Sequence, residues 1–392
     1  MSRCIVCGQP LSEAELTLYR EAAAEGAAEG AAEGAAEGAA KGAAKGAAKG
    51  AAEGAAKAAA KGAAEATAEG AAAIHTHCAR KVFRVPYAPE CPYTLQQLLD
   101  EALRQDPSQA GSNLLSLNLA LTDESEERRA AFCLSESGAN YTLSVVNSPD
   151  RDDLRVAVVV QRMAAATHLN IAPWALVETL DGATALVQLQ TQFGRRRVAL
   201  PQRSIAEIMI ENSAQSSATA QPDTTAQTHA SAQIDPTSQS PNIEAVAALV
   251  ASHTTAAKLE VINLYEALYF CWMVGCNSLS LNNIYLVTKP DGFTTLAPLR
   301  SLTSTLLLSS CSDDDDGDEH DTAPFTIASK RSDINADDFT KSMLSSGVNQ
   351  KVAENMIAKF SALIDTWCDI IEEADLSEEM GERLKFALFI KG

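Results

Sequence analysis

The chain has 392 residues, of which 46% are hydrophobic, so a sizeable core is possible, and its formal net charge is −20. Such an acidic chain lacks the clustered basic face that nucleic-acid phosphates require, and its short basic run, Arg195 to Arg197, is interpreted as a solvated turn. No stretch reaches the ~18 apolar residues of a membrane-spanning helix, and the first residues contain no apolar signal segment. We therefore expect a cytoplasmic protein that contacts neither a membrane nor nucleic acid directly.

Four side chains in the N-terminal part have the spacing of a zinc site. Cys4 and Cys7 form a C-x-x-C pair, and His75 and Cys78 form an H-x-x-C pair. In a reducing compartment closely spaced cysteines more often bind metal, and three thiolates with one imidazole suit a tetrahedral structural zinc. His77 is not chosen as a ligand, because adjacent residues do not readily point two ligands the same way. We predict a zinc knuckle built from residues 1–20 and 74–90; the alternative is four unrelated reduced side chains.

Two low-complexity stretches interrupt the chain. Residues 21–73 repeat Ala-Ala-Glu/Lys-Gly with a four-residue period, and each glycine costs a helix about 1 kcal/mol. The repeat has no apolar stripe that could pack on a core, so we interpret it as an expansion in the loop between the two halves of the zinc knuckle. Loop-closure entropy rises slowly with length, so the expansion is compatible with the metal site. Residues 212–242, rich in Ser, Thr, Ala and Gln, are predicted to be a second, disordered insertion.

The remaining sequence changes from strand-like to helix-like patterns along the chain. Alternating apolar residues predict strands over 114–121, 141–146 and 183–191. Helical periodicity predicts helices over 154–168, 244–252, 258–274, 339–345, 350–374 and 377–389. Strands first and helices later predict an α+β protein with a small β-rich lobe followed by a larger helical lobe.

Three motifs in the first hundred residues are similar to the start of short HipA-type proteins. They are Cys4-x-x-Cys7-Gly8-x-Pro10-Leu11, Ile74-His75-x-x-Cys78-x-Arg80-Lys81-x-Phe83 and Cys91-Pro92-Tyr93-Thr94-Leu95. The similarity resumes over 163–177, 264–287 and 376–383, so it covers nearly everything outside the two insertions. The chain thus resembles the HipA-like serine/threonine kinase toxins, in the short form with an N-terminal zinc knuckle. The resemblance implies a bilobal protein-kinase-like fold, with an N-lobe over 91–190 and a C-lobe over 191–392.

The resemblance also implies where the residues for phosphoryl transfer should stand. Active members use a lysine on the nucleotide, an aspartate near the attacking hydroxyl, and Asn and Asp on Mg²⁺. The lysine position falls on Ser144, the catalytic aspartate on Ser278 and the Mg²⁺ aspartate on Ser301, and only Asn283 matches the family. Two further segments depart from the family: its Gly-Val-Gln-Pro-Lys loop falls on Asn113 to Ser116, and the acidic residues of the next helix fall on Val156 to Val158. A neutral serine can neither take the proton nor hold Mg²⁺, so the chemistry is expected to be lost.

These substitutions predict a catalytically inactive pseudokinase that acts through protein binding, in a toxin–antitoxin type system. The resemblance implies a related HipA-type kinase or an antitoxin as the partner. Structural zinc is the expected cofactor, whereas ATP and Mg²⁺ are not expected to bind. Two alternatives stay open. The first is residual nucleotide binding, through Asn283, or activity as a HipA-type serine/threonine kinase toxin. The second is a decaying, non-functional paralogue.

Overall fold

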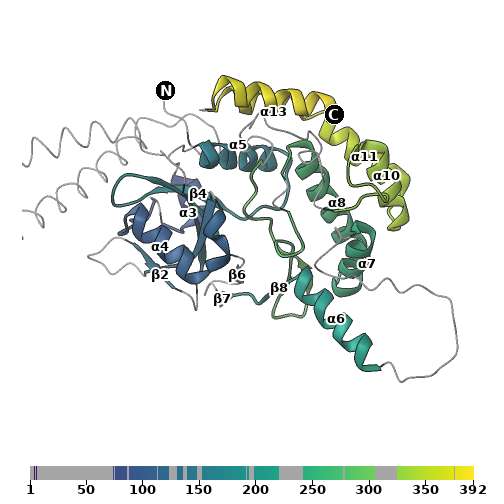
Figure 1. The fold of residues 1–392 in the computed structure, drawn as a ribbon, viewed down its shortest axis with the longest axis horizontal. Coiled ribbons are helices and arrows are strands. Elements are labelled where there is room, and N and C mark those ends of the chain that lie inside the picture. Colours follow the sequence, from purple (N-terminus) through teal and green to yellow (C-terminus); the bar gives the residue numbers. More distant parts are fainter. Residues whose placement is uncertain are drawn as a thin grey trace, which may run out of the picture.

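The computed structural model of the chain describes residues 4, 6, 74, 76–85, 88–112, 114–122, 130–135, 139–147, 152–190, 192–193, 198–219, 242–276, 279–304, 325–374 and 376–392. Figure 1 shows a β-rich part that contains α3, α4 and β4, and beside it a helical part that contains α7, α8, α10 and α11. The α+β architecture predicted from the order of strands and helices is confirmed.

A five-stranded antiparallel sheet with the strand order β2-β1-β3-β5-β4 is the centre of the β-rich part. Its strands are β1 (Leu114–Leu121), β2 (Phe132–Leu134), β3 (Tyr141–Val146), β4 (Trp174–Glu178) and β5 (Thr184–Leu189). Leu115, Leu117 and Leu119 are buried and the residues between them are half-buried, so β1 has one apolar face, as a strand on a core requires. The three strands predicted from alternation are confirmed as β1, β3 and β5.

Helices cover both faces of this sheet. They are α3 (Thr76–Val82) and α4 (Leu95–Gln105), with the 3-10 turn η1 (Pro107–Gly111), and α5 (Asp152–Ala166). α3 and α4 share an apolar cluster with one face of the sheet, which includes Leu143. Val158 of α5 belongs to the cluster on the other face, whereas Val160 and Met163 of α5 belong to the core of the helical part. α5 therefore joins the two cores.

The helical part is built around α8, most of whose residues are buried. Its helices are α6 (Ile205–Thr219), α7 (Ile243–His253), α8 (Ala257–Met273), α10 (Ala336–Ser345), α11 (Gln350–Ser361), α12 (Ile364–Glu372) and α13 (Glu378–Lys391). Aromatic rings fill the core: the ring centroid of Tyr269 lies 4.9 Å from that of Phe339 and 5.1 Å from that of Phe360. In the part of the chain that the structure describes, no helix has both the length and the hydropathy needed to cross a bilayer.

One predicted helix is two helices. The helix predicted over 350–374 is interrupted at Ala362 and Leu363, which separate α11 from α12. Phe360 before the break and Trp367 after it are both buried in the same core. The apolar periodicity therefore continues across the turn, which is why the pattern did not reveal it.

The boundary of the second insertion also differs from the prediction. The insertion was predicted to be disordered from residue 212, but α6 runs through Thr219. Adding residues to an existing helix costs less than starting one, so the polar sequence continues the helix. Residues 220–241 lie outside the described residues, as do 21–73.

A second antiparallel sheet of three strands, with the order β10-β9-β8, belongs to the helical part. Its strands are β8 (Gln202–Ser204), β9 (Tyr285–Thr288) and β10 (Thr294–Leu296), while β6 (Gln192–Phe193) and β7 (Val198–Ala199) pair separately. A tight turn joins β9 to β10, in which Gly292 has a φ of +82° and Asp291 accepts a hydrogen bond from the Phe293 N–H at 3.0 Å. This hairpin fixes the relative positions of the segments before and after it.

Candidate functional site

The β9–β10 hairpin brings together two segments in which the resemblance implies site residues. Asn283 lies two residues before β9, and Ser301 lies five residues after β10. The Ala297 N–H donates to the Tyr285 carbonyl at 2.8 Å, so both segments leave the hairpin at the same end. Ser278, at the position of the family's catalytic aspartate, lies outside the described residues.

Ser301 is held against the five-stranded sheet through its backbone. Its N–H donates to Oε1 of Gln188 at 3.0 Å, and Gln188 is a fully buried residue of β5. Ser301 has a φ of +55°, the left-handed region, which costs a non-glycine residue about 1–2 kcal/mol. The hydrogen bond to Gln188 offsets part of this cost. A neutral amide thus fixes the segment on which the family's Mg²⁺ aspartate is expected.

Ser144 is fully buried inside the same sheet. Its Oγ lies 3.2 Å from the Oγ of Ser116 in β1. The pairing of β3 with β5 puts Ser144 and Gln188 on one face of the sheet, the face that α5 covers. The structure therefore brings Ser301 to the sheet face that carries Ser144.

The side of α5 that packs on the sheet carries a buried carboxylate, Asp153, four residues before Ala157 of the same apolar cluster, and a buried amide. Gln161 lies three residues after Val158 and hence on the same side of the helix. It is fully buried, and neither end of its amide has a hydrogen-bond partner in the described part of the chain. The next residue, Arg162, pairs at 2.9 Å with Glu373, the residue that follows α12, and so joins α5 to the helical part. Val156 to Val158, where the family's acidic residues were expected, are buried among apolar side chains.

Sequence reasoning missed Gln161, Gln188 and Arg300. An inward-facing glutamine in the alternating pattern of β5 was the available signal for Gln188, but its meaning depends on strand register. Arg300 is half-buried, and its guanidinium lies 5.0 Å from the ring centroid of Tyr285 and donates to Oε1 of Gln202 at 2.5 Å. Burial lowers the pKa of Arg300, although arginine remains a cation at neutral pH. This positive charge beside Ser301 is thus directed toward β8 and β9.

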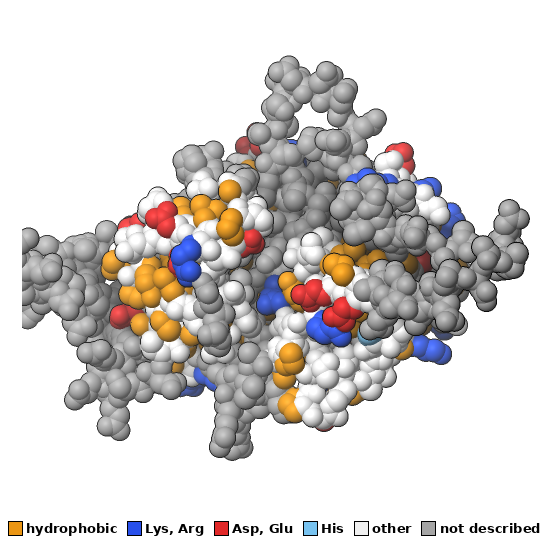
Figure 2. All heavy atoms as spheres, turned by 60° about the horizontal axis from the view of Figure 1, so that its bottom comes forward, with side chains coloured by type: hydrophobic (Ala, Val, Ile, Leu, Met, Phe, Trp, Pro, Cys, Tyr) orange, Lys and Arg blue, Asp and Glu red, His pale blue; other side chains and the backbone are white. Residues whose placement is uncertain are grey.

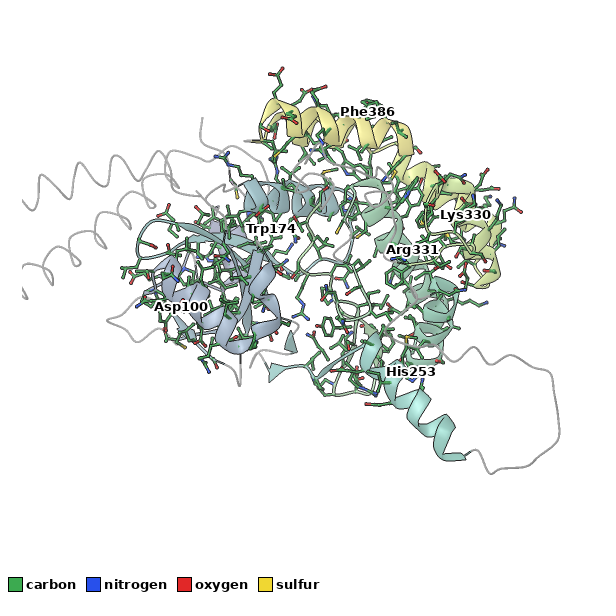
Figure 3. All side chains as sticks on the ribbon, in the orientation of Figure 1. Asp100, Trp174, His253, Lys330, Arg331 and Phe386 are labelled. Atoms are coloured by element: carbon green, nitrogen blue, oxygen red, sulfur yellow. The ribbon has the colours of Figure 1, made fainter. Side chains whose placement is uncertain are left out.

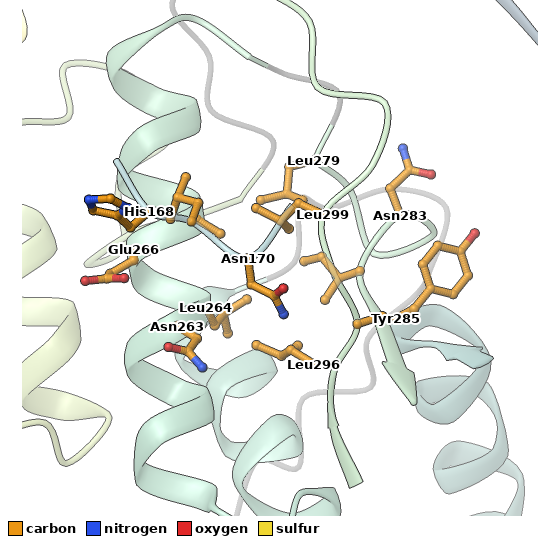
Figure 4. Close-up of a pocket in the computed structure, with 14 residues that line it drawn as sticks. His168, Asn170, Asn263, Leu264, Glu266, Leu279, Asn283, Tyr285, Leu296 and Leu299 are labelled. Carbon is orange, nitrogen blue, oxygen red and sulfur yellow. The ribbon is translucent and has the colours of Figure 1, made fainter. Parts of the chain in front are cut away.

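A pocket of about 110 Å³ lies between α8, the β9–β10 hairpin and the segment after α5 (Figure 4). Asn283 lines this pocket, whereas Ser144 and Ser301 do not. Ligand pockets usually have volumes of about 300–1,000 Å³, so this one is too small for a nucleoside triphosphate. Its acidic residue, Glu266, is engaged by Nζ of Lys359 at 3.1 Å.

Polar side chains line the pocket on two sides, and Asn170 lies between them. In Figure 4 His168, Asn263 and Glu266 lie on one side and Asn283 lies on the other. His168 ends α5 in the left-handed conformation, with a φ of +61°, and the Leu169 N–H donates to the Ala164 carbonyl at 3.2 Å. His168 therefore has a clear structural role at the end of this helix.

The predicted zinc ligands are only partly described. Cys4 and Cys78 are both buried and belong to the same apolar cluster of the β-rich part. Nε2 of His77 lies 3.6 Å from the Cys78 sulfur. Cys7 and His75 lie outside the described residues, and the residues that are described contain no group of three or more potential ligands. The zinc site stays a prediction. The location of Cys4 and Cys78 in one cluster is compatible with it.

Comparison with known proteins identifies the fold at the level of its class. No protein-family model matches the chain, and no curated protein matches it. Solved structures do match, and the fold that they define is the HipA-like kinase fold.

Two of these structures show how distant the likeness is. HipA of Shewanella oneidensis MR-1, solved with HipB and its operator DNA, is 12% identical with a TM-score of 0.52, over 78% of this chain and 72% of that chain. The Helicobacter pylori proinflammatory kinase CtkA is 10% identical with a TM-score of 0.41, over 70% of this chain and 91% of that one. At such identities the HipA match establishes a shared fold, and the function has to be argued from the residues.

Proposed function

We propose that this chain is a HipA-like pseudokinase, which keeps the kinase fold, does not transfer phosphate and acts by binding another protein. The observation that carries the proposal is that neutral serines with neutral partners stand at the positions where the resemblance implies the family's lysine and Mg²⁺ aspartate. Ser144 is buried against Ser116, and Ser301 is tied by its backbone to Gln188. Phosphoryl transfer depends on cations and carboxylates around the phosphates, and hydroxyls and amides cannot replace them.

The proposed partner is an antitoxin or a related HipA-type kinase. The support is analogy of fold, because HipA of Shewanella oneidensis MR-1 was solved in a toxin–antitoxin complex with HipB and its operator DNA. Direct contact with nucleic acid is not proposed, since the chain carries a net charge of −20. Figure 2 shows one face of the molecule, on which the acidic and basic side chains of the described residues are interspersed without a large basic patch.

The decisive experiment is a phosphorylation assay with radiolabelled ATP and either Mg²⁺ or Mn²⁺. We expect neither autophosphorylation nor transfer to tRNA synthetases, the substrate class that the resemblance suggests, while an active HipA-type kinase labels them in parallel. Incorporation of phosphate that disappears in Asn283→Ala would contradict the proposal. A nucleotide-induced rise in melting temperature without phosphate transfer would favour the alternative of residual nucleotide binding, because a ligand selective for the folded state stabilises it by mass action.

Structural zinc is proposed as the cofactor, held by Cys4, Cys7, His75 and Cys78. Three thiolates and one imidazole leave no open position, so the metal would stabilise the fold and take no part in a reaction. Protein purified with reductant should contain about one zinc per chain. Cys78→Ser should lower the zinc content sharply, whereas Cys133→Ser, a cysteine of β2, should leave it unchanged. Metal analysis that finds no zinc in the wild-type protein would remove this assignment.

A further inference from the structure

The pocket of about 110 Å³ lies where the two lobes are joined. Its walls come from α8, from the β9–β10 hairpin and from the segment between α5 and β4. That segment leads to Trp174, which Figure 3 shows on the side of the β-rich part that faces the helical part. Protein interiors rarely leave space much larger than a water molecule. This space exists because two lining residues, Ala267 and Ala297, are buried but too short to fill it.

Most of the pocket wall is aliphatic. The larger aliphatic side chains that line it are Leu264, Leu279, Ile284, Leu296 and Leu299. Asn170, which also lines the pocket, is exposed, so the pocket opens to solvent at this residue. An apolar cavity of about 150 Å³ is large enough to bind benzene. A single six-membered ring therefore matches this pocket, with one edge of the ring at the opening.

Asn170 is the polar residue at the centre of the pocket. In Figure 4 its carboxamide lies among Leu264, Leu296 and Leu299. The Asn170 carbonyl accepts a hydrogen bond from the Leu299 N–H at 2.8 Å, whereas its side chain has no hydrogen-bond partner in the described part of the chain. A carboxamide presents an acceptor oxygen and a donor nitrogen side by side. Its complement is another amide edge, in which an N–H and a C=O are adjacent.

The charged groups near the pocket favour a neutral ligand. Nζ of Lys359 pairs with Oε1 of Glu266 at 3.1 Å, and the Arg300 guanidinium donates to Gln202. An ionised group among the aliphatic side chains would lose its hydration without gaining an unpaired group of opposite charge. A neutral amide would instead exchange its hydrogen bonds with water for hydrogen bonds with Asn170.

We infer that this pocket binds a small neutral lactam, a ring whose N–H and C=O pair with the Asn170 carboxamide. The ligand would contact both segments of the junction between the lobes, where the Ala172 N–H donates to the Leu299 carbonyl at 2.9 Å. His168 and Ser301, at the two ends of this junction, have φ values of +61° and +55°. Such strained residues are concentrated at ligand clamps and switch regions. The inference goes beyond the proposed function, because it involves neither nucleotide nor phosphate transfer.

The probes are three six-membered rings of equal size. δ-Valerolactam has the amide edge, cyclohexanone only accepts a hydrogen bond, and piperidine is a cation at neutral pH. Titration of the full chain, followed by ligand-observed NMR, should give a dissociation constant of about 1 mM for the lactam. Cyclohexanone and piperidine should bind about tenfold more weakly, because each leaves half of the carboxamide without a partner.

Two variants locate the binding in this pocket. Asn170→Leu removes the carboxamide but keeps the side-chain size, so the lactam should lose about tenfold in affinity and bind no better than cyclohexanone. Ala267→Leu should fill the pocket and abolish binding of both rings. Gln96→Leu, which removes an exposed amide of α4, is the matched control and should bind as the wild type does. Circular dichroism checks that each variant is folded, and Asn170→Leu alone decides the test if Ala267→Leu does not fold.

Uridine distinguishes a free lactam from the base of a nucleoside, because its lactam edge belongs to a ring that carries a ribose. The pocket holds one ring, so uridine should bind at least about tenfold more weakly than δ-valerolactam. The inference is overturned if the lactam does not bind, or if cyclohexanone, piperidine or uridine binds as tightly. It is also overturned if Asn170→Leu retains the preference for the lactam. Ligand that binds the folded chain should also raise the wild-type melting temperature in proportion to its affinity, and an unchanged melting temperature at saturating lactam would likewise exclude the site.

Discussion

At the scale of single residues, some buried polar side chains have hydrogen-bond partners and others have none among the described residues. Asp338 of α10 is 1% exposed and accepts hydrogen bonds from Lys330 at 2.8 Å and from the Asn335 N–H at 3.2 Å. Gln161 is equally buried and has no partner among the described residues. A buried polar group stabilises a fold only when its hydrogen bonds are made, so these two residues should respond to substitution in opposite ways.

Asp338→Asn should destabilise the protein in a manner that depends on pH. Burial raises the pKa of the Asp338 carboxyl, but the hydrogen bonds from Lys330, Asn335 and Lys341 outweigh burial, and the pKa lies below its usual value of 3.8. A carboxyl with a lowered pKa contributes stability that is complete above its unfolded value and is lost as pH falls through the folded value. Because both lysines are largely exposed, we expect a loss of only about 1–2 kcal/mol at neutral pH.

Urea denaturation at pH 7 and at pH 3 measures this difference. The wild type should have the higher free energy of unfolding at pH 7. This difference from Asp338→Asn should be smaller at pH 3, where the wild-type carboxyl begins to take up a proton. Asp337→Asn changes the exposed neighbour in the same first turn of α10 and should have a small effect at both pH values. If the difference in the free energy of unfolding is the same at both pH values, or if Asp337→Asn causes an equal loss, the ionised Asp338 carboxylate is not the source of this stability.

At the scale of elements, sequence patterns predicted the strands with alternating apolar residues and missed a strand whose residues are nearly all buried. β1 and β3 were predicted to the residue because apolar side chains alternate along both strands, although β3 is buried on both faces. β4 was missed because Trp174 to Val177 are all buried, and a continuous apolar run has no alternation. The neutral contacts of the candidate site were also invisible, since the hydrogen bond from Ser301 to Gln188 joins residues 113 positions apart and depends on strand register.

Gln161→Met and Gln188→Met form a matched pair of changes on α5 and β5. Gln161→Met removes two polar atoms without partners and keeps the side-chain volume, so the free energy of unfolding should rise by about 1 kcal/mol. Gln188→Met removes the acceptor of the Ser301 N–H together with an Nε2 that has no partner among the described residues, so the net cost should be about 1 kcal/mol. Chemical denaturation of both variants measures these changes. If Gln161→Met is as destabilising as Gln188→Met, the Gln161 amide is hydrogen-bonded to ordered water.

At the scale of the whole molecule, the two lobes are joined by several kinds of contact. α5 contributes to the apolar clusters of both lobes, and Arg162 pairs with Glu373. The Ala172 N–H donates to the Leu299 carbonyl at 2.9 Å, beside the bond from Ser301 to Gln188. The resemblance to HipA-like kinases correctly implied the fold, because it rested on the order and spacing of motifs along most of the chain. It could not imply the contacts of Ser144 with Ser116 and of Ser301 with Gln188, since these join distant segments.

The alanine-rich repeat is where sequence and structure jointly predict tolerance to a large deletion. Cys4, before the repeat, and Ile74, after it, are buried in the same apolar cluster, so both flanks are anchored on the β-rich lobe. Replacing residues 21–73 by a short Gly/Ser linker should therefore keep both anchors. The loop shrinks by 53 residues at most (21 to 73 inclusive), and closing a shorter loop costs about 1 kcal/mol less entropy. We expect the melting temperature to be unchanged or to rise by a few degrees, and the zinc content to equal that of the full chain.

Phe83→Ala, which truncates a fully buried ring of the same lobe, is the comparison and should lower the melting temperature strongly. If the linker variant lowers the melting temperature nearly as much as Phe83→Ala does, the repeat packs on the lobe and is part of its structure.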